Sequence, residues 1–496
     1  MLHLFQKLVM TAMLVLASVT PVFAQYSNLP AMGDTARDEL SPLMEYRIGT
    51  EIMRRIQVDP DYVADGVIIE YLNTLGNRLV SATPAVRGEA VNDFFFFAIR
   101  DSSLNAFALP GGFIGVHTGL MIAAQSESEL ASVLAHEIGH VSQRHIARMV
   151  SQRKQDLLIP IAAIVLAAIA GASRNADLAG ALITGGHGLA IQKQLNFSRD
   201  AEREADRVGF QILQAAGFDT NAAASFFERL QLASRNYGES ISVYLRTHPL
   251  TTERIADMQT RARSEPYRQH ADSADFNFAR IRARLLQDGS VKGLEAASVE
   301  FNDLIRTGGR FHVAAGYYGQ ALLALRQDNP ARAAEYLQES RNRLGERMAR
   351  NSLALASTAI DIKIVANKPQ EASREALAAL ARFPTSRTLS YQFADALFKE
   401  GRYETASQYL RRQKQIYRND QALRNMLAKV YDAQGKIALM HLELAESYSL
   451  AGGLSAALEQ LALARQAPDV TFYDHSIIDA REREWRARRL EELKGR

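Results

Sequence analysis

The stretch Ala131-Ser-Val-Leu-Ala-His136-Glu137-Ile-Gly-His140-Val141 is the most informative part of this 496-residue chain. It contains the pattern His-Glu-x-x-His, and three features predict that the pattern lies on a helix. Ser126 and Glu129 form a capping box in front of it, apolar residues recur at helical spacing through it, and no proline interrupts it.

The helical spacing brings two histidines together. Residues four apart lie one above the other on a helix, so His136 and His140 point the same way and can both bind one Zn²⁺. Glu137 is rotated by about 100°, beside the metal, where a general base that activates water must lie. The alternative is that these groups only cap the core, but their burial in so apolar a helix is unfavourable without a metal. We therefore predict one Zn²⁺ per subunit.

Length and composition restrict the alternatives. A chain of 496 residues is too long for one core, so two or more domains are expected. The formal net charge is +3 and the charges are interspersed, which argues against nucleic acid as a partner. The chain has no cysteine, so zinc must be bound by His, Asp or Glu.

Residues 1–24 have the pattern of a signal peptide. Lys7 ends a short basic start, an apolar run covers 8–19, and Ala24 is a small residue suited to cleavage. The alternative is a membrane anchor, but the run is shorter than the roughly 20 residues that a span needs. We predict export to a bacterial periplasm and cleavage after Ala24.

A small sheet is predicted just before the His-Glu-x-x-His helix. Residues 94–99 form a buried strand, and 105–120 form two strands around the turn Pro110-Gly111-Gly112. A free strand edge beside the metal helix could pair with the backbone of an extended substrate. An ordinary hairpin is the alternative, and both interpretations can hold.

A later helix offers the third metal ligand. Catalytic zinc takes three protein ligands and keeps one position open. Glu202 and Asp206 are four residues apart and share a face, whereas Glu204 points elsewhere. We predict that Glu202 binds the metal and that Asp206 orients a ligand histidine through a hydrogen bond. A solvated charged face is the alternative for such a pair in isolation.

Three further histidines have open roles. His145 follows His140 by five residues, leaves the metal face, and is either a surface residue or a residue behind a ligand. His187, in a glycine-rich loop, could visit the metal. His248, fixed before Pro249, either stabilises the oxyanion of the intermediate, or occupies the open metal position and keeps the enzyme latent, or is a plain turn histidine.

The segment 157–190 is apolar at first and then rich in glycine and alanine. A buried helix with a glycine loop, a lid over the site and a peripheral membrane contact all fit this composition. A membrane anchor at 159–170 is the weakest alternative, because the apolar stretch is too short and too interrupted for a span.

The C-terminal half carries a repeat. Ala372, Ala406 and Met440 occupy equivalent places in three helix-turn patterns and stand 34 residues apart, which is the tetratricopeptide period. This period predicts a helical solenoid, whose concave surface usually binds protein. An irregular helical bundle is the alternative.

Taken together, three motifs resemble the HtpX/CAAX-protease family of zinc metallopeptidases, which are gluzincins. The motifs are Asn105-Ala-Phe-Ala-Leu-Pro-Gly-Gly, His136-Glu-x-x-His140 and Ser198-Arg-x-x-Glu202-x-x-Ala-Asp206, within about residues 30–265. The resemblance implies that His136, His140 and Glu202 bind Zn²⁺, that Glu137 is the base, and that Asp206 supports a ligand. The best-known members span the membrane several times; this chain has no clear spanning helix, so a soluble member is implied.

The expected fold class is α+β. A signal peptide (1–24) precedes a mainly helical metallopeptidase domain with a small β-sheet (25–270), and an all-α tetratricopeptide-repeat solenoid (271–496) follows. This order resembles exported members of the family with repeat tails. The resemblance implies a protease with chaperone-like activity on unfolded or misassembled outer-membrane proteins at the barrel-assembly machinery. The alternative function is a repeat-based chaperone or assembly scaffold in which proteolysis is minor or latent. His248 is counted with Glu137 and Asp206 as a candidate catalytic residue.

Overall fold

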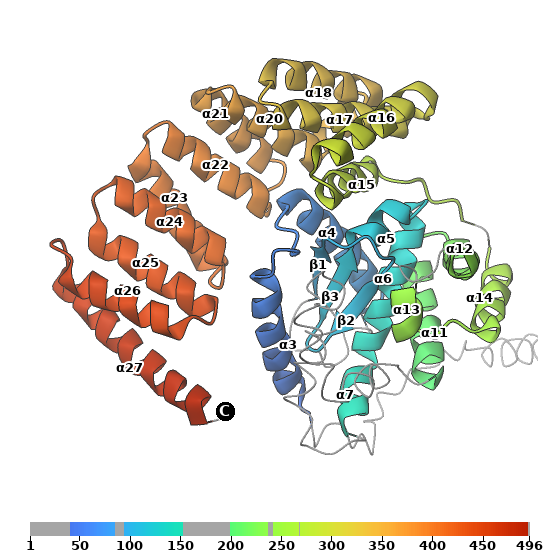
Figure 1. Ribbon diagram of the computed structural model, residues 1–496, viewed down its shortest axis with the longest axis horizontal. Coiled ribbons are helices and arrows are strands. Elements are labelled where there is room, and N and C mark those ends of the chain that lie inside the picture. Colours follow the sequence, from blue (N-terminus) through green and yellow to red (C-terminus); the bar gives the residue numbers. More distant parts are fainter. Residues whose placement is uncertain (1–39, 85–93, 152–198, 237–241, 267, 495–496) are drawn as a thin grey trace, which may run out of the picture.

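The computed structural model describes residues 40–84, 94–151, 199–236, 242–266 and 268–494. In this part of the chain, a mainly helical region around a three-stranded sheet is followed by helices alone (Figure 1). The predicted fold class is therefore confirmed. The predicted signal peptide, the segment 157–190 and His187 lie outside the described residues. No helix in the described ranges is both long and apolar enough to cross a membrane.

The sheet has the strand order β1-β3-β2. β1 (Phe95–Ile99) runs parallel to β3 (Phe113–His117), and β2 (Ala106–Leu109) pairs antiparallel with β3. The predicted turn joins β2 to β3, with Gly111 and Gly112 at φ of 80° and 91°, a region that L side chains rarely adopt. β2 is an edge strand of this sheet, with no second partner strand among the described residues.

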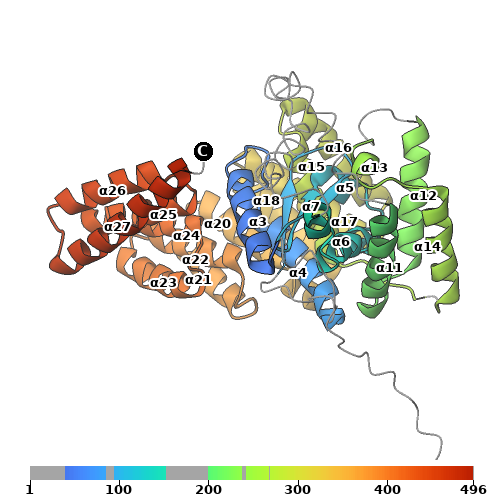
Figure 2. The ribbon, with the colours of Figure 1, turned by 90° about the horizontal axis from the view of Figure 1, so that it is seen from below.

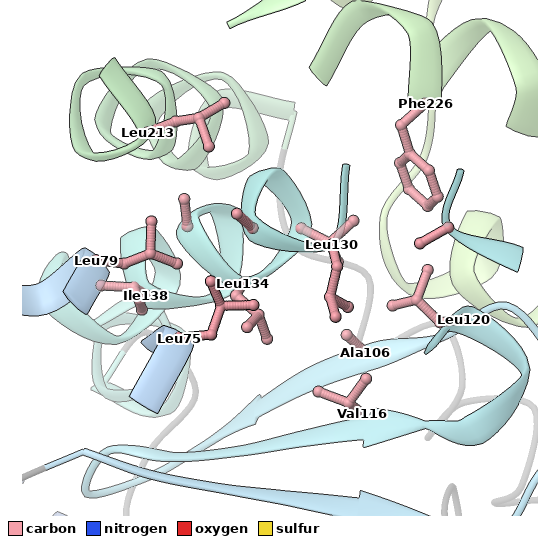
Figure 3. Close-up of a cluster of buried hydrophobic side chains, with 14 of the residues drawn as sticks. Leu75, Leu79, Ala106, Val116, Leu120, Leu130, Leu134, Ile138, Leu213 and Phe226 are labelled. Atoms are coloured by element: carbon pink, nitrogen blue, oxygen red, sulfur yellow. The ribbon is translucent and has the colours of Figure 1, made fainter. Parts of the chain in front are cut away.

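Alternation along the strands gives the sheet two apolar faces. Phe97 and Ile99 of β1 point to one face and pack with α3 (Pro42–Gln57), whereas Phe96 and Ala98 belong to the larger core on the other face. That larger core includes α4 (Gly66–Ala82) and α6 (Glu127–Ser142). Figure 3 shows the α4 side chains Leu75 and Leu79 beside α6, and the strand side chains Ala106 and Val116 near Leu130 of α6.

Helix α6 carries the His-Glu-x-x-His pattern and begins at the predicted cap. The backbone N–H of Glu129 donates to Ser126 Oγ at 3.2 Å, and the Glu129 carboxylate accepts from the N–H of Gln125 at 2.6 Å. The return bond of the capping box thus reaches one residue further back than usual. The predicted helix is confirmed.

Two glycines let α6 approach α11 (Arg199–Ala215) closely. A Cβ on Gly139 of α6 would lie 2.9 Å from the carbonyl oxygen of Ala205, and a Cβ on Gly209 of α11 would lie 2.9 Å from the backbone nitrogen of His136. Both contacts are with backbone, which cannot move aside as a side chain can. This close approach brings the acidic residues of α11 beside the histidines of α6.

Further helices complete the first region. They are α5 (Thr118–Ala123), α7 (His145–Ser151), α12 (Asn221–Asn236), α13 (Ser242–Thr247) and α14 (Thr252–Ser264). In Figure 1, α11 to α14 lie on the side of α6 away from α3.

The C-terminal helices repeat with the predicted period. α20 (Leu353–Val365), α22 (Arg387–Lys399) and α24 (Gln421–Ala433) begin 34 residues apart, and so do α21 (Pro369–Leu380), α23 (Tyr403–Ile416) and α25 (Ile437–Leu450). The other helices of this part are α15 (Ala274–Gln287), α16 (Val291–Thr307), α17 (Arg310–Arg326), α18 (Pro330–Leu344), α19 (Glu346–Arg350), α26 (Leu454–Gln466) and α27 (Phe472–Lys494). Figure 2 shows α21 to α27 extending away from the first region on the side of α3.

Helix α15 joins the two parts. Phe276, Ala279 and Ala283 pack in the core around α6, whereas Phe278 and Ile281 pack with α16 to α20. The carboxylate of Glu127, at the start of α6, accepts hydrogen bonds from the backbone N–H and the hydroxyl of Ser273, the N-cap of α15, at 3.2 and 2.7 Å. Helix α6, which carries the His-Glu-x-x-His pattern, is therefore tied directly to the first of the C-terminal helices.

Candidate metal centre

Four buried side chains converge between α6, α11 and the segment after α13. His136, His140, Glu202 and His248 each offer one ligand atom, and these atoms all lie within 4.8 Å of one another. The four side chains are between 1% and 4% exposed. The structure thus brings together the three residues expected to bind metal and adds His248.

The distances between the converging atoms fit one small cation. His140 Nε2 lies 3.0 Å from His136 Nε2, which lies 3.4 Å from His248 Nδ1. Glu202 Oε1 lies 3.1 Å from His248 Nδ1 and 3.5 Å from His140 Nε2. Zinc–nitrogen bonds of 2.0–2.1 Å in a tetrahedral site would separate ligand atoms by roughly 3.3 Å. A set of lone pairs at this spacing, shielded from water, favours a cation at its centre.

The local electrostatics favour positive charge in the same place. Burial raises the pKa of Glu202, but His248 and His136 outweigh it, so the pKa of this carboxyl lies well below its usual range. Burial lowers the pKa of His136, but hydrogen bonds to Asp206 and Glu202 raise it to about 10. The carboxylates therefore hold a cationic charge at the cluster, which a metal ion can supply in place of a proton.

Asp206 lies behind His136, as predicted from the sequence. Its Oδ1 lies 2.9 Å from His136 Nδ1, which fixes that nitrogen as the N–H and leaves Nε2 to face the cluster. Arg254 donates to both oxygens of Asp206, at 2.6 and 2.8 Å, and its Nη1 lies 2.9 Å from Glu202 Oε2. Burial raises the pKa of Asp206, but Arg254 and His136 outweigh burial and lower it.

Glu137 is the most buried acid of the site, with 0% of its surface exposed. Neither carboxylate oxygen forms a well-aligned hydrogen bond within the described residues, and Oε1 lies 3.4 Å from His248 Nε2. Burial raises the pKa of Glu137, an effect that His248 and His136 partly offset. A buried carboxylate with a raised pKa, next to a candidate metal cluster, is suited to accept a proton.

His248 closes the fourth side of the cluster. Its backbone N–H donates to the carbonyl of Tyr244 at 2.8 Å, and its ring stacks on the Tyr244 ring at 4.7 Å. Arg254 Nη1 donates to the carbonyl of Pro249 at 2.8 Å, so the residue after His248 is held as well. The ring therefore lies in a defined place, with Nδ1 toward the cluster and Nε2 toward Glu137.

His145 is buried, so the surface alternative for this residue is excluded. Its Nδ1 lies 2.8 Å from His140 Nδ1, and its Nε2 lies 3.2 Å from Glu204 Oε2. Glu204 points away from the cluster, as expected, and contacts Arg148 instead.

Sequence reasoning passed over Arg254 and Tyr244. Arg254 lies six residues after His248, on α14, but a lone arginine on a helix is ordinarily a surface residue, so the sequence carried no clear signal. Tyr244 carries no signal by spacing; its packing on His248 is a tertiary contact.

Comparison with known proteins agrees with this geometry. The profile of peptidase family M48 matches residues 70–262, which contain the described α6 and α11. The "Beta-barrel assembly-enhancing protease" of Escherichia coli (strain K12) is 31% identical over 472 residues, 95% of this chain and 94% of the relative. The chain belongs to peptidase family M48.

Other relatives cover less of the chain. A relative in Vibrio cholerae, also named as a beta-barrel assembly-enhancing protease, is 41% identical over 276 residues, which are 54% of each protein. The "Mitochondrial metalloendopeptidase OMA1" of Schizosaccharomyces pombe is 32% identical over 183 residues, 37% of this chain and 51% of that protein. The family resemblance stated from the sequence motifs and the predicted enzyme class, a metalloprotease, are confirmed.

Proposed function

We propose that this M48 metalloprotease is a zinc-dependent endopeptidase of the bacterial periplasm, with a latent active site. The observation that carries the proposal is the buried cluster His136, His140, Glu202 and His248, with Glu137 beside it. The absence of cysteine leaves nitrogen and oxygen ligands, and their spacing suits one Zn²⁺.

His136, His140 and Glu202 would hold the zinc ion. When bound, zinc lowers the pKa of a water molecule and polarises the scissile carbonyl. Glu137 takes the proton from the attacking water and passes it to the leaving amine. Asp206 and Arg254 keep His136 and Glu202 in place during these steps.

His248 fits the role of a latch better than that of an oxyanion donor. Its Nδ1 is the fourth converging ligand atom, in the position that a zinc ion with three protein ligands keeps open, and its Nε2 faces the base Glu137. The same ring thus covers both the open metal position and the proton acceptor. Cleavage then requires the segment after α13 to move away, which disrupts the Tyr244 stacking and the Arg254–Pro249 hydrogen bond.

The edge strand β2 is a suitable place for the substrate backbone. It packs against α6 and is paired only on the β3 side within the described ranges. Backbone pairing gives binding with little dependence on the substrate side chains. This mode suits an unfolded protein more than a folded one.

The repeat region, which we take to begin at residue 271, would recruit protein partners. The relatives in Escherichia coli and Yersinia pestis are both named for assembly of β-barrels. We therefore propose unfolded or misassembled outer-membrane proteins as substrates and the barrel-assembly machinery as the place of action. A periplasmic location, after cleavage of a signal peptide at Ala24, is part of the same proposal.

The test is cleavage of an unfolded outer-membrane protein by residues 25–496, with zinc content determined on the same samples. Wild type, Glu137→Gln and His248→Ala are compared. We expect zinc in all three, loss of cleavage by roughly 10²–10⁴-fold in Glu137→Gln, and faster cleavage in His248→Ala. Absence of zinc from the wild type contradicts the metal site, and slower cleavage in His248→Ala contradicts the latch.

A second candidate function is a chaperone or scaffold in which proteolysis is minor. The covered state of Glu137 favours this alternative, since a closed site would leave the repeats as the active part. If Glu137→Gln supports outer-membrane assembly as well as the wild type does, binding is the main function and peptidase activity is secondary.

A further inference from the structure

His145 contacts the proposed zinc ligand His140, and the mechanism above does not use this contact. Its Nδ1 lies 2.8 Å from Nδ1 of His140, and the two rings meet edge to face with centroids 4.8 Å apart. On its other side, Nε2 lies 3.2 Å from Oε2 of Glu204, and Arg148 Nη2 donates to the same oxygen at 2.7 Å. His145 is 3% exposed.

The backbone is shaped to make this contact. Residues five apart on a continuous helix point in different directions. Here α6 ends at Ser142, Arg144 adopts φ of 51°, and α7 begins at His145. Residues other than glycine rarely adopt such a φ, because this backbone conformation costs them about 1 kcal/mol or more. The break turns His145 back toward His140, whose ring it would otherwise miss.

The hydrogen bonds from His140 to His145 and from His145 to Glu204 are donated in the same direction. His140 Nε2 faces the cluster, so it must be the unprotonated nitrogen if it binds metal, and Nδ1 carries the hydrogen. That hydrogen is donated to Nδ1 of His145, which must then be an acceptor. The hydrogen of His145 therefore lies on Nε2 and is donated to Glu204.

We propose that His145 and Glu204 are positioning residues that fix the ring orientation and the tautomer of His140. The arrangement matches the one on the other ligand, where Asp206 fixes His136 and Arg254 fixes Asp206. On the His140 side, a neutral imidazole stands between the ligand and the carboxylate, and Arg148 holds the carboxylate. The inference rests on the proposed zinc site.

A purely structural role for His145 makes a different prediction. If the ring only fills space, an apolar replacement of similar volume should serve as well, and a polar replacement should gain nothing. If the ring accepts the hydrogen bond of His140, a side chain with an oxygen near the Nδ1 position should restore what an apolar one loses. His145→Leu and His145→Asn separate these two cases.

The experiment measures zinc affinity by competition with a chelator and the visible spectrum of the Co²⁺-substituted protein, on the full mature chain. We expect His145→Leu to lower zinc affinity by roughly 10–100-fold and to shift the Co²⁺ bands, with most of both effects reversed in His145→Asn. The control is His117→Asn, a change at a buried histidine on β3 whose Nδ1 contacts Ser103 at 2.8 Å. It should leave both readouts unchanged.

Glu204 provides a test that does not alter the core. Its side chain is 27% exposed, so Glu204→Leu should fold even if His145→Leu does not. We expect Glu204→Leu to lower zinc affinity by about 3–10-fold and Glu204→Gln, which keeps an acceptor oxygen, to lower it less.

The outcomes separate the inference from the proposed function. Unchanged affinity and spectrum in both His145→Leu and Glu204→Leu overturn the positioning role while the zinc site stands. Equal losses in His145→Leu and His145→Asn also overturn it. A wild-type protein that binds no zinc overturns the proposed site, and the inference with it.

Discussion

Two buried polar clusters in this protein are built on opposite principles. In the cluster of His136, His140, Glu202 and His248, four possible ligand atoms converge, and the nearby carboxylates favour a positive charge among them. In the joint between the two parts of the molecule, Arg282 donates to Asp65 at 2.6 Å, to the Tyr318 hydroxyl at 2.6 Å and to the Thr358 hydroxyl at 3.1 Å.

The difference in bonding between the two clusters indicates their different roles. The Arg282 cluster matches donors to acceptors and is complete as it stands, so it fixes α15 against α4, α17 and α20. The cluster of His136, His140, Glu202 and His248 needs a cationic charge at its centre, either a proton or a metal ion, because a buried carboxylate without a positive partner is unfavourable. One cluster serves architecture, and the other serves chemistry.

Removal of a proposed metal ligand should have the largest effect. In His136→Ala, the converging set loses a member, so we expect loss of cleavage and loss of zinc-dependent stabilisation. For the wild type, free zinc at 1,000 times its Kd should add about 4 kcal/mol to the free energy of unfolding. Thermal unfolding with and without zinc measures this directly. A zinc-induced shift as large as that of the wild type would contradict the role of His136.

Removal of Arg282 should damage the other cluster without touching the metal. Arg282→Met leaves Asp65 with an unpaired charge, and because the two side chains are 11% and 16% exposed we expect a loss of about 2–4 kcal/mol of stability. Urea unfolding gives the value. The matched control is Arg284→Met on the same helix, whose partner Glu300 is 47% exposed; it should cost less than about 1 kcal/mol. Zinc affinity should stay constant in both.

Arg254 and Asp206 form a buried ion pair beside the metal cluster. A substitution of Arg254 tests whether this pair supports metal binding. Arg254→Lys keeps the positive charge. A lysine, however, cannot contact the two carboxylate oxygens of Asp206 and the carboxylate of Glu202 at the same time. We expect zinc affinity to fall by roughly 10–100-fold. Arg261→Lys, which alters an exposed pair with Asp257 on the same helix, is the control and should bind zinc as the wild type does. Equal affinity in the two variants would remove Arg254 from the site.

The smallest effect is a pH dependence at the joint. Burial raises the pKa of Asp275 to about 6, although a hydrogen bond from Ser352 Oγ at 2.7 Å opposes the rise. The folded protein therefore binds this proton more tightly than the unfolded chain does. The stabilisation is fully present below about pH 4 and is lost as the pH rises through about 6.

Asp275→Asn removes that titration and keeps an acceptor for Ser352. Between pH 5 and pH 7.5, we expect the wild type to lose about 1–1.5 kcal/mol of stability relative to the variant. Chemical unfolding of both proteins at the two pH values measures the difference, since the other titrating groups are shared. Parallel pH profiles would show that Asp275 is ionised in the folded protein.

Much of this architecture is encoded locally. The helix of His136 and His140 follows from its cap and apolar spacing, and the solenoid follows from a 34-residue period that the helix starts reproduce. Both are properties of short segments, since a helical turn or a helix pair is decided by neighbours in the chain. The pairing of Glu202 with Asp206 is local in the same way.

Other features were decided only by tertiary packing. His248 is 112 residues from His136 in the sequence, and its spacing left three roles open; its contacts with the cluster and Glu137 favour one of them. Arg254 became part of the site because α14 packs on α11.

His145 shows most clearly which contacts could not be predicted from the sequence. Helical spacing alone sends it away from His140, and the backbone turn at Arg144 brings it back. The sequence by itself determined that His136 and His140 share a helix face with Glu137 beside them, and that the C-terminal helices repeat, because these features depend on residues close together in the chain. Only the tertiary structure decided which side chains close and support the site, because contacts between distant segments depend on the packing of whole helices, such as the close approach at Gly139 and Gly209.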